Sequence, residues 1–391
     1  MKKNYDLSTR CVHAGEAGDA EGSPHTPIYN TTTFGFRSTA DLLDVVEGRR
    51  PGNLYTRYGL NPTIRSVEAK LASLENAESA LVFPSGMAAE AALFFTHGRK
   101  GIVCLGNAYG GTLALLTDHL PLLGIPTTLL LGDGVGKLGD ALKNGPGLVF
   151  FETPTNPTME IFDIREICKL SHSYGALVAV DNTFASPINQ QVLALGADIA
   201  VHSATKYLGG HSDLTGGSLM GSKQNIEPVA PWRKNLGQMM APEVAGLLSR
   251  SLRTLPIRVE RQNKTAQAVA EAMRNHPKAA RVLYPGLPDF PQHALAKSQM
   301  SGFGGMLTLE INGSGEDATK VIDGLELIII APSLGGPESL ATQPMTTTHH
   351  GLTPEERLKR GITDSMIRFS IGMEAASDLI EDLNSALANV G

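Results

Sequence analysis

Two neighbouring stretches decide the fold: "ALVAVDN" (176–182) and "DIAVHSATKYLGGHSD" (198–213). Each is a short apolar run that ends in polar residues, with Asp181 closing the first run and Lys206 following the second. Short apolar runs bounded by turn residues are typical of strands buried on both faces of a sheet. Lysine side chains usually lie in solvent. A lysine at a strand end, between small hydroxylated residues and just before two glycines, is a candidate functional residue. Taken alone it is more often a surface residue, and its placement together with other polar strand ends is what favours a function.

Further apolar runs precede these two and alternate with helix-like segments. The runs are "ALVF" (80–83), "GIVCL" (101–105), "TTLLL" (127–131) and "LVFFE" (148–152). Between them lie segments with helical spacing, such as "MAAEAALFFTHG" (87–98) and "IREICKLSHSYG" (164–175). This alternation predicts an α/β fold with a large, mostly parallel sheet that helices cover on both faces.

The pattern changes at both ends of this region. Residues 1–60 show little periodicity and predict an extended arm, which either crosses a neighbouring subunit or forms a surface loop. A long helical pattern begins near Leu255, fewer strands follow it, and a closing helix is expected near Ala375. We therefore predict three parts: an arm (1–60), a large domain (61–254) and a smaller C-terminal α/β domain (255–391).

Composition excludes several classes of protein. The chain has 391 residues, of which 42% are hydrophobic and 18% charged, as in a globular protein. A net charge of −6 without a polybasic run argues against nucleic acid, and no apolar stretch suits a membrane span. The first residues lack a secretory pattern, and the three cysteines are not closely spaced, so we expect a cytoplasmic protein with reduced thiols.

Ligands collect at the carboxyl ends of strands in open parallel sheets, and one such end predicts an anion site. "PSGMAA" (84–89) follows a predicted strand and opens a helix, where free N–H groups and the helix dipole favour a phosphate. Gly86 lets the main chain approach that phosphate, and the hydroxyls of Ser203 and Thr205 are further donors.

Asp181 and Lys206 add two other chemical requirements. A buried carboxylate needs a partner, and a protonated ring nitrogen would serve. A lysine in a desolvated site becomes a nucleophile that forms an imine with an aldehyde. Phosphate, aldehyde and protonated pyridine are the three functional groups of pyridoxal 5′-phosphate (PLP) that a protein can bind, and we predict PLP as the cofactor.

These residues belong to a longer series of motifs. The chain resembles the Cys/Met-metabolism family of PLP-dependent enzymes, which includes the cystathionine γ-synthases, the cystathionine γ- and β-lyases and the methionine γ-lyases. The matching blocks run in the family's order over nearly the whole chain: "YTRYGLNPT" (55–63), "FPSGMAA" (83–89), "AYGGT" (108–112), "ETPTNP" (152–157), "VDNTFASP" (180–187), "HSATKYLGGHSD" (202–213), "PSLGGPES" (332–339) and "IRFSIG" (367–372).

The resemblance implies the PLP-dependent transferase type I fold, an active dimer that commonly pairs into a homotetramer, and a role for each matching residue. Lys206 would bond to the cofactor and move protons, and Asp181 would hold the ring nitrogen protonated. Tyr109 would stack on the ring and assist at the substrate, and Ser333 would position the lysine or the substrate. The phosphate ligands would be Gly86, Met87, Ser203 and Thr205, with Tyr55 and Arg57 from the adjacent subunit. Asn156 and Arg368 would hold the carboxylate of an amino-acid substrate. From the strand pattern alone, the solvent face of its strand is the favoured place for Arg368.

The exact reaction stays open within the family. Gly111 stands where methionine γ-lyases typically carry a cysteine, and Pro332 stands where many γ-synthases and γ-lyases carry a glutamate for the distal ammonium of cystathionine. We therefore favour γ-replacement or γ-elimination on homoserine-derived substrates, with cystathionine γ-synthase as the best single assignment. Cystathionine γ-lyase, cystathionine β-lyase and methionine γ-lyase are the alternatives. A PLP-binding carrier or regulator without catalysis is the alternative from another class.

Two other motifs lead elsewhere and are weaker. "GVGKLG" (134–139) satisfies the dinucleotide-binding pattern G-x-G-x-x-G, but the segment after it breaks too early for the long helix that this fold needs. The spacing of the histidines matches no usual zinc pattern, so no metal site is expected.

Overall fold

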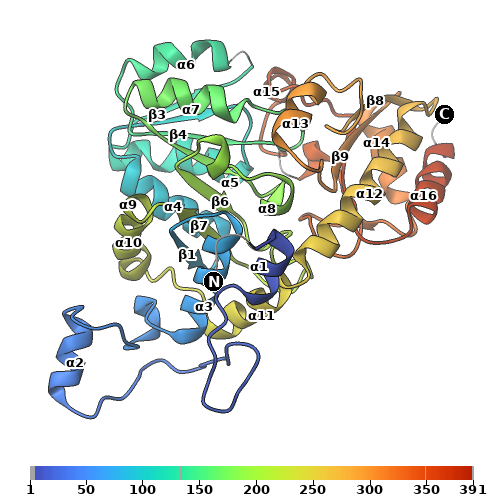
Figure 1. Cartoon of the computed structure of the whole chain (residues 1–391). Helices are drawn as coiled ribbons and strands as arrows, with labels where there is room; N and C mark the ends of the chain where they lie inside the picture. Colours follow the sequence, from blue (N-terminus) through green and yellow to red (C-terminus); the bar gives the residue numbers. More distant parts are fainter. Residues whose placement is uncertain (1–4, 133, 348, 390–391) are drawn as a thin grey trace.

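The computed structural model describes residues 5–132, 134–347 and 349–389, so the ends of the predicted arm and of the C-terminal part lie outside it. Within these residues the main element is a seven-stranded sheet (Figure 1). Its strands, in spatial order, are β1 (Ser79–Phe83), β7 (Gly217–Gly221), β6 (Ile199–His202), β5 (Leu177–Asp181), β4 (Leu148–Glu152), β2 (Ile102–Leu105) and β3 (Thr127–Leu130). The five strands from β6 to β3 are parallel, and β7 is antiparallel to both of its neighbours. The predicted mostly parallel sheet is confirmed.

Both faces of this sheet are buried, as the apolar runs predict. Along β4, Val149 and Phe151 enter one hydrophobic cluster, while Leu148 and Phe150 enter a second cluster on the opposite face. All four side chains are fully buried. Alternating side chains point to opposite faces of a strand, so a run of unbroken apolar residues supplies two cores at once.

Helices cover the two faces, and some of them begin at a side-chain cap. Asn61 caps the first of them by accepting a hydrogen bond from Thr63 N, with Pro62 in the first turn, and Asp163 caps another through Glu166 N. The helices are α3 (Pro62–Leu74), α4 (Gly86–His97), α5 (Gly110–Ala114), α6 (Gly134–Leu142), α7 (Ile164–Ser173), α8 (Ser186–Asn189), α9 (Lys223–Ile226), α10 (Ala230–Asn235) and α11 (Pro242–Leu252). The single turns between the larger elements are Thr56–Tyr58, Leu115–His119, Pro121–Leu123, Leu193–Leu195, Glu227–Val229 and Pro344–Thr346.

The C-terminal part has its own smaller sheet, seen at the right of Figure 1. Its strands, in spatial order, are β10 (Ile329–Ile330), β11 (Leu340–Thr342), β12 (Met366–Ser370), β9 (Met306–Ile311) and β8 (Ala279–Leu283), and all of its pairs except β10–β11 are antiparallel. The helices are α12 (Leu255–Arg274), α13 (His293–Gln299), α14 (Gly315–Asp323), α15 (Pro354–Lys359) and α16 (Ala376–Ala388). Both helices expected from the sequence, near Leu255 and near Ala375, are present.

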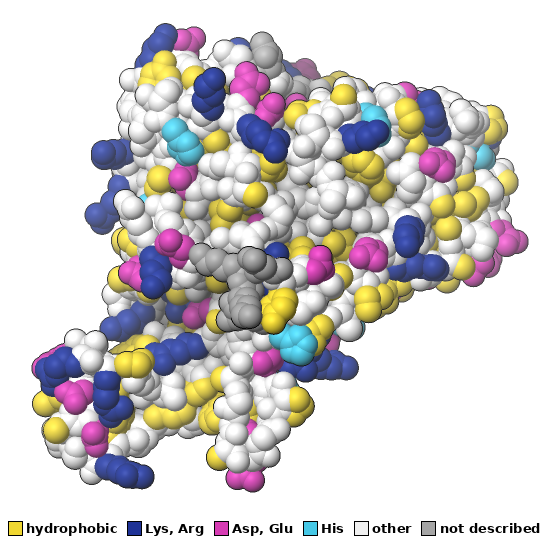
Figure 2. All heavy atoms as spheres, viewed as in Figure 1, with side chains coloured by type: hydrophobic (Ala, Val, Ile, Leu, Met, Phe, Trp, Pro, Cys, Tyr) yellow, Lys and Arg dark blue, Asp and Glu magenta, His cyan; other side chains and the backbone are white. Residues whose placement is uncertain are grey.

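The N-terminal arm contains two short helices, α1 (Leu7–His13) and α2 (Thr39–Val46). The segment with α1 packs on the large domain, where the buried ammonium of Lys70 donates to Cys11 O at 2.9 Å and pairs with Glu16 at 3.0 Å. The segment with α2 extends away from the body of the chain at the lower left of Figures 1 and 2. It leaves large apolar side chains exposed, among them Ile28 and Val46.

Two alternatives can be compared directly with the structure. The stretch 134–139 lies inside helix α6 and not in a turn before a helix, which argues against a dinucleotide-binding loop. Among the described helices, none is both long and apolar enough to cross a bilayer. No cluster of His, Cys, Asp and Glu that suits a metal ion occurs in the described part of the chain.

Candidate active site

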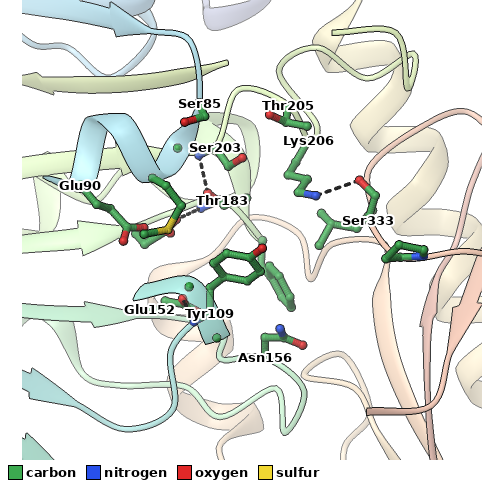
Figure 3. A pocket seen from close by; sticks show the side chains of 18 of the residues that line it. Ser85, Glu90, Tyr109, Glu152, Asn156, Thr183, Ser203, Thr205, Lys206 and Ser333 are labelled. Carbon is green, nitrogen blue, oxygen red and sulfur yellow. Dashed lines mark hydrogen bonds between the residues drawn. The ribbon is translucent and has the colours of Figure 1, made fainter. Parts of the chain in front are cut away.

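A cavity of about 780 Å³ opens at the carboxyl ends of β4, β5 and β6. Its floor comes from the large sheet, and its opposite wall comes from the C-terminal part (Figure 3). Most of the predicted site residues line it: Gly86, Met87, Tyr109, Asn156, Asp181, Ser203, Thr205, Lys206, Ser333 and Arg368. The strand-end rule that suggested Asp181 and Lys206 thus places both in one cavity.

Lys206 lies between the two parts of the chain. Its Nζ donates a hydrogen bond to Ser333 Oγ at 2.8 Å (Figure 3). Burial, assisted by the charge of Arg368, lowers the pKa of Lys206 to about 8. An amine with this pKa is partly neutral near physiological pH, so it can act as a nucleophile or as a base. Ser333 has a φ of 99°, a strained value for a residue other than glycine, which indicates that the surrounding structure holds its backbone in place.

Arg368 is buried in the middle of β12, with only 5% of its surface exposed, which excludes the solvent-facing alternative. Its Nη1 donates to Asn156 Oδ1 at 3.2 Å, and its Nη2 donates to Ser333 O at 3.0 Å. Its Nε is buried without a hydrogen-bond partner among the described residues. Burial lowers the pKa of Arg368 to about 10, so it keeps its charge near neutral pH. A buried guanidinium with spare donors suits a carboxylate ligand.

The start of α4 forms an anion cradle beside the lysine. Ser85 caps the helix by accepting a hydrogen bond from Ala88 N, and Gly86 begins the first turn. A Cβ atom on Gly86 would lie 3.0 Å from Ser203 Cβ, so any larger residue would push against the segment between β6 and Lys206. The hydroxyl of Thr205, by contrast, donates to Gly216 O at 3.2 Å within the protein.

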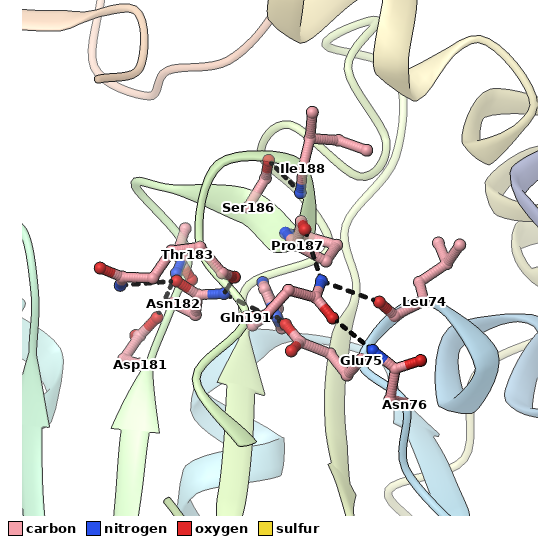
Figure 4. Close-up of polar contacts among 12 residues, drawn as sticks. Leu74, Glu75, Asn76, Asp181, Asn182, Thr183, Ser186, Pro187, Ile188 and Gln191 are labelled. Atoms are coloured by element: carbon pink, nitrogen blue, oxygen red, sulfur yellow. Dashed lines mark hydrogen bonds and ion pairs between the residues drawn. The ribbon is translucent and has the colours of Figure 1, made fainter. Parts of the chain in front are cut away.

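Asp181 closes β5 with its carboxylate in the cavity, and its Oδ1 accepts from Thr183 N at 2.8 Å (Figure 4). Burial raises the pKa of Asp181, while hydrogen bonds from Thr183 and the charge of His202 act in the opposite direction. His202 forms a buried pair with Glu75, with 2.7 Å between Nε2 and Oε1. Asn182 Nδ2 also donates to Glu75 Oε1, at 3.1 Å. A polar network therefore lies directly behind Asp181.

Comparison with known proteins decides the family. The sequence pattern of the Cys/Met metabolism PLP-dependent enzymes matches residues 8–388. The chain belongs to this family. It is 42% identical to cystathionine gamma-synthase 1, chloroplastic, of Arabidopsis thaliana, over 96% of this chain and 68% of that protein. It is 38% identical to L-methionine gamma-lyase of Pseudomonas deceptionensis, over 98% of both chains. The crystal structure of cystathionine gamma synthase from Xanthomonas oryzae pv. oryzae in complex with cystathionine has a TM-score of 0.92, at 36% identity over 98% of both chains.

PLP is therefore the cofactor of this enzyme family, and the cavity fits it. The cradle at Gly86, the amine of Lys206 and the carboxylate of Asp181 all line one space, as the phosphate, the aldehyde and the ring nitrogen require. When bound, PLP supplies an electron sink that makes the Cα–H of an amino acid acidic.

Three residues near the proposed ring site were not predicted from the sequence: Glu90, Glu152 and Thr183. Glu152 closes β4 in register with Asp181 and accepts a hydrogen bond from Tyr109 N, and Thr183 bonds Asp181. The strand-end rule could have found Glu152, because it occupies the same position on its strand as Asp181. Glu90 lies one turn after Gly86 on α4, and nothing in a single sequence marks a helix glutamate as buried.

Tyr55 and Arg57 do not line the cavity of their own chain. Arg57 Nη1 donates to Lys234 O at 2.9 Å, and its guanidinium lies 5.0 Å from the ring centre of Tyr58. Both residues belong to the arm, so their role in a second subunit's site stays a prediction.

Proposed function

We propose that this enzyme catalyses γ-replacement on an O-acylated homoserine, with cysteine as the incoming nucleophile, and is thus a cystathionine γ-synthase. The observation that carries the proposal is the double contact of Ser333, which accepts Lys206 Nζ at its hydroxyl and Arg368 Nη2 at its carbonyl. A substrate held by its carboxylate at Arg368 would have its Cα next to the amine. The similarity to a protein named cystathionine gamma-synthase adds support.

Loss of a group from Cγ requires more proton transfers by the base than loss of a group from Cβ. Loss of a group from Cβ follows removal of one proton, whereas loss from Cγ also needs a proton shift and removal of a Cβ proton. Lys206 has a long flexible side chain, a lowered pKa and a hydroxyl partner at the cavity wall. These properties suit a base that takes a proton at one carbon and serves a second.

The remaining residues have roles that we propose from their positions. Asp181 holds the ring nitrogen, Tyr109 stacks on the ring, and Asn156 supports Arg368 at the substrate carboxylate. Gly86, Met87 and Ser203 bind the phosphate. Thr205 joins them only if its hydroxyl turns away from Gly216 O.

The wall beside Ser333 indicates the kind of γ-substituent. Pro332 and Leu334 line the cavity there, so an apolar surface replaces a carboxylate at position 332. An ammonium group gains little from such a wall, because it would lose hydration without an acidic partner. The ester of an acylated homoserine carries no ammonium and suits this wall better. The ammonium of the incoming cysteine would then have to keep its hydration away from Pro332 and Leu334.

γ-Elimination is the second candidate, because the chain is also similar to an L-methionine gamma-lyase. Gly111 argues against methionine as the main substrate. A Cβ at this position would lie 2.8 Å from Tyr109 Cε1 and 3.1 Å from Met87 Sδ, so the tyrosine ring fills the space that a cysteine would need.

We also propose that the active unit is a dimer, paired into a homotetramer in the cytoplasm, with the arm of one subunit bringing Tyr55 and Arg57 to the phosphate of its neighbour. The exposed apolar side chains of the arm, including Ile28 and Val46, support burial against another subunit. The three free cysteines, all buried, suit a reducing compartment. Native mass spectrometry tests the assembly, and an Arg57→Ala variant that keeps full PLP affinity would contradict the role of the arm.

A product panel tests the reaction. The enzyme is incubated with cystathionine, methionine, and O-succinyl-, O-acetyl- and O-phosphohomoserine, each with and without cysteine, and products are identified by mass spectrometry. We expect cystathionine from an acyl donor only when cysteine is present. A 2-oxo acid and ammonia from methionine or cystathionine, at higher rates, would identify a lyase. Bound cofactor without turnover of any of these would favour the carrier alternative.

A further inference from the structure

Glu90 is a carboxyl group of the cavity to which the proposed reaction gives no part. It lies on α4, four residues after Gly86, so one face of the helix presents both the anion cradle and this acid. The residue is 3% exposed and lines the same cavity as Asp181 and Lys206. In Figure 3 it lies at the side of the cavity opposite Lys206.

The surroundings of Glu90 offer hydrogen bonds but no positive charge within reach. Thr112 Oγ1 donates to Glu90 Oε2 at 2.6 Å. Among the described residues, no lysine, arginine or histidine forms an ion pair with it. The charged groups with which it interacts in the cavity are acids, Asp181 on β5 and Glu152 on β4. The cationic groups on elements that pack against α4 are engaged elsewhere: His202 on β6 pairs with Glu75, Arg233 on α10 pairs with Glu68, and Lys234 on α10 lies over the ring of Tyr58.

Three carboxyl groups thus share the sheet side of the cavity, while the cofactor ring brings one positive charge to it. Buried acids this close cannot all ionise. Asp181 is the one that hydrogen bonds favour as an anion, because Thr183 donates to it and His202 lies behind it. Burial and the charge of Asp181 raise the pKa of Glu90 to about 8.

We propose that Glu90 is a positioning residue of the cofactor site that carries a proton near neutral pH and ionises as the solution becomes alkaline. In its neutral form it leaves Asp181 as the single anion that faces the ring nitrogen. In its ionised form it adds a negative charge beside the ring and stabilises the cationic form of the bound cofactor. The inference goes beyond the proposed reaction, since it depends on cofactor binding and not on which substrate is turned over.

The first test is the pH titration of the visible absorption of the bound cofactor. Glu90→Gln keeps the size and hydrogen bonding of the side chain but removes its negative charge. We expect the alkaline transition of the cofactor to move to lower pH by about one unit, because a single buried charge in the same cavity shifts a pKa by about that amount. The matched control is Glu166→Gln, an exposed glutamate on α7, which should leave the transition in place. An unchanged transition in Glu90→Gln would overturn the proposal.

A second variant covers the case in which Glu90→Gln loses the fold or the cofactor. Thr112→Val removes the hydrogen-bond donor with little change in volume, so Glu90 should stay neutral to higher pH. The cofactor transition should then move in the same direction as in Glu90→Gln, and an unmoved transition would again refute the role.

Infrared difference spectra give a readout without turnover. Wild type minus Glu90→Gln should show a protonated carboxyl band at neutral pH that disappears on raising the pH above 9, as about 90% ionisation of the group predicts. No such band at neutral pH would show that Glu90 is ionised there and would rule the inference out. If instead the spectra agree with the proposal and the product panel yields no cystathionine, only the assigned reaction fails.

Discussion

Glu152 and Asp181 stand at paired positions on β4 and β5, and both carboxyl groups end in one buried cavity. Burial raises the pKa of each, and the charge of Asp181 raises that of Glu152 further. Glu152 accepts the N–H of Tyr109, whereas Asp181 accepts the N–H of Thr183. Glu152 therefore holds the backbone of Tyr109, for which we propose stacking on the ring, while Asp181 is the acid that we propose for the ring nitrogen.

Loss of the lysine should stop the chemistry altogether. In Lys206→Ala we expect no borohydride-stable bond between cofactor and protein, and turnover lower by at least about 10³-fold, because both nucleophile and base are gone. Mass spectrometry of the reduced, digested protein locates the label. A label at another lysine, or turnover within tenfold of wild type, would contradict the assignment.

The same lysine should destabilise the cofactor-free protein. Its pKa is lowered from an ordinary value near 10.5 to about 8, so the unfolded chain binds more protons between these two pH values and stability rises with pH across that interval. Below pH 8 the lowered pKa of Lys206 destabilises the folded state by its full amount. We expect the free energy of unfolding of cofactor-free Lys206→Met to exceed that of the wild type by about 1–3 kcal/mol at pH 7, a range that allows for the partial exposure of the lysine. The gain should shrink as the pH approaches 10.5. Urea unfolding at several pH values measures it, and a pH-independent difference would disprove the stated cause.

The planar guanidinium of Arg368 should contribute more to activity through its geometry than through its charge alone. In Arg368→Lys the ammonium cannot reach Asn156, Ser333 and a substrate carboxylate together, so we expect kcat/KM to fall about 10–100-fold. Arg274→Lys, on the surface, is the matched control and should have little effect. Equal activity of the two variants would argue against carboxylate binding at Arg368.

The buried pair behind Asp181 should dominate local stability. His202→Leu leaves Glu75 buried with Asn182 as its remaining donor, so we expect a loss of about 3–5 kcal/mol in the free energy of unfolding. Glu47→Gln removes one partner of an exposed pair with Arg49 and should cost less than about 1 kcal/mol. Similar losses in both would mean that burial of the pair contributes little.

Space around the tyrosine can be tested with a single added side chain. Gly111→Cys places a Cβ against the ring of Tyr109 and should tilt it, lowering kcat/KM about tenfold or more and changing the circular dichroism of the bound cofactor. Gly139→Cys on α6 meets open space and is the control. If Gly111→Cys keeps the wild-type dichroism, Tyr109 does not pack as described.

The sequence predicts those parts of the site that lie at the ends of strands in the parallel sheet. Asp181, Lys206 and Gly86 follow strands, and strand ends in a parallel sheet face one crevice. Glu90 could not be found in this way, because its burial depends on how α4 packs against the sheet. The short helices of the arm were missed since each depends on a local cap, Asp6 in α1 and Ser38 in α2, more than on an apolar pattern. The proposed role of Tyr55 depends on a second copy of the chain, which no single sequence describes.

The strained residue Ser333 contacts two proposed functional side chains at once. Its carbonyl and its hydroxyl engage Arg368 and Lys206 at the same time. A carboxylate bound at the guanidinium would compete with that carbonyl for its N–H donors, next to a residue whose φ of 99° is strained. Ser333 therefore joins the guanidinium that we propose for the substrate carboxylate to the amine that we propose as the base, so we expect a change at either side chain to affect the other.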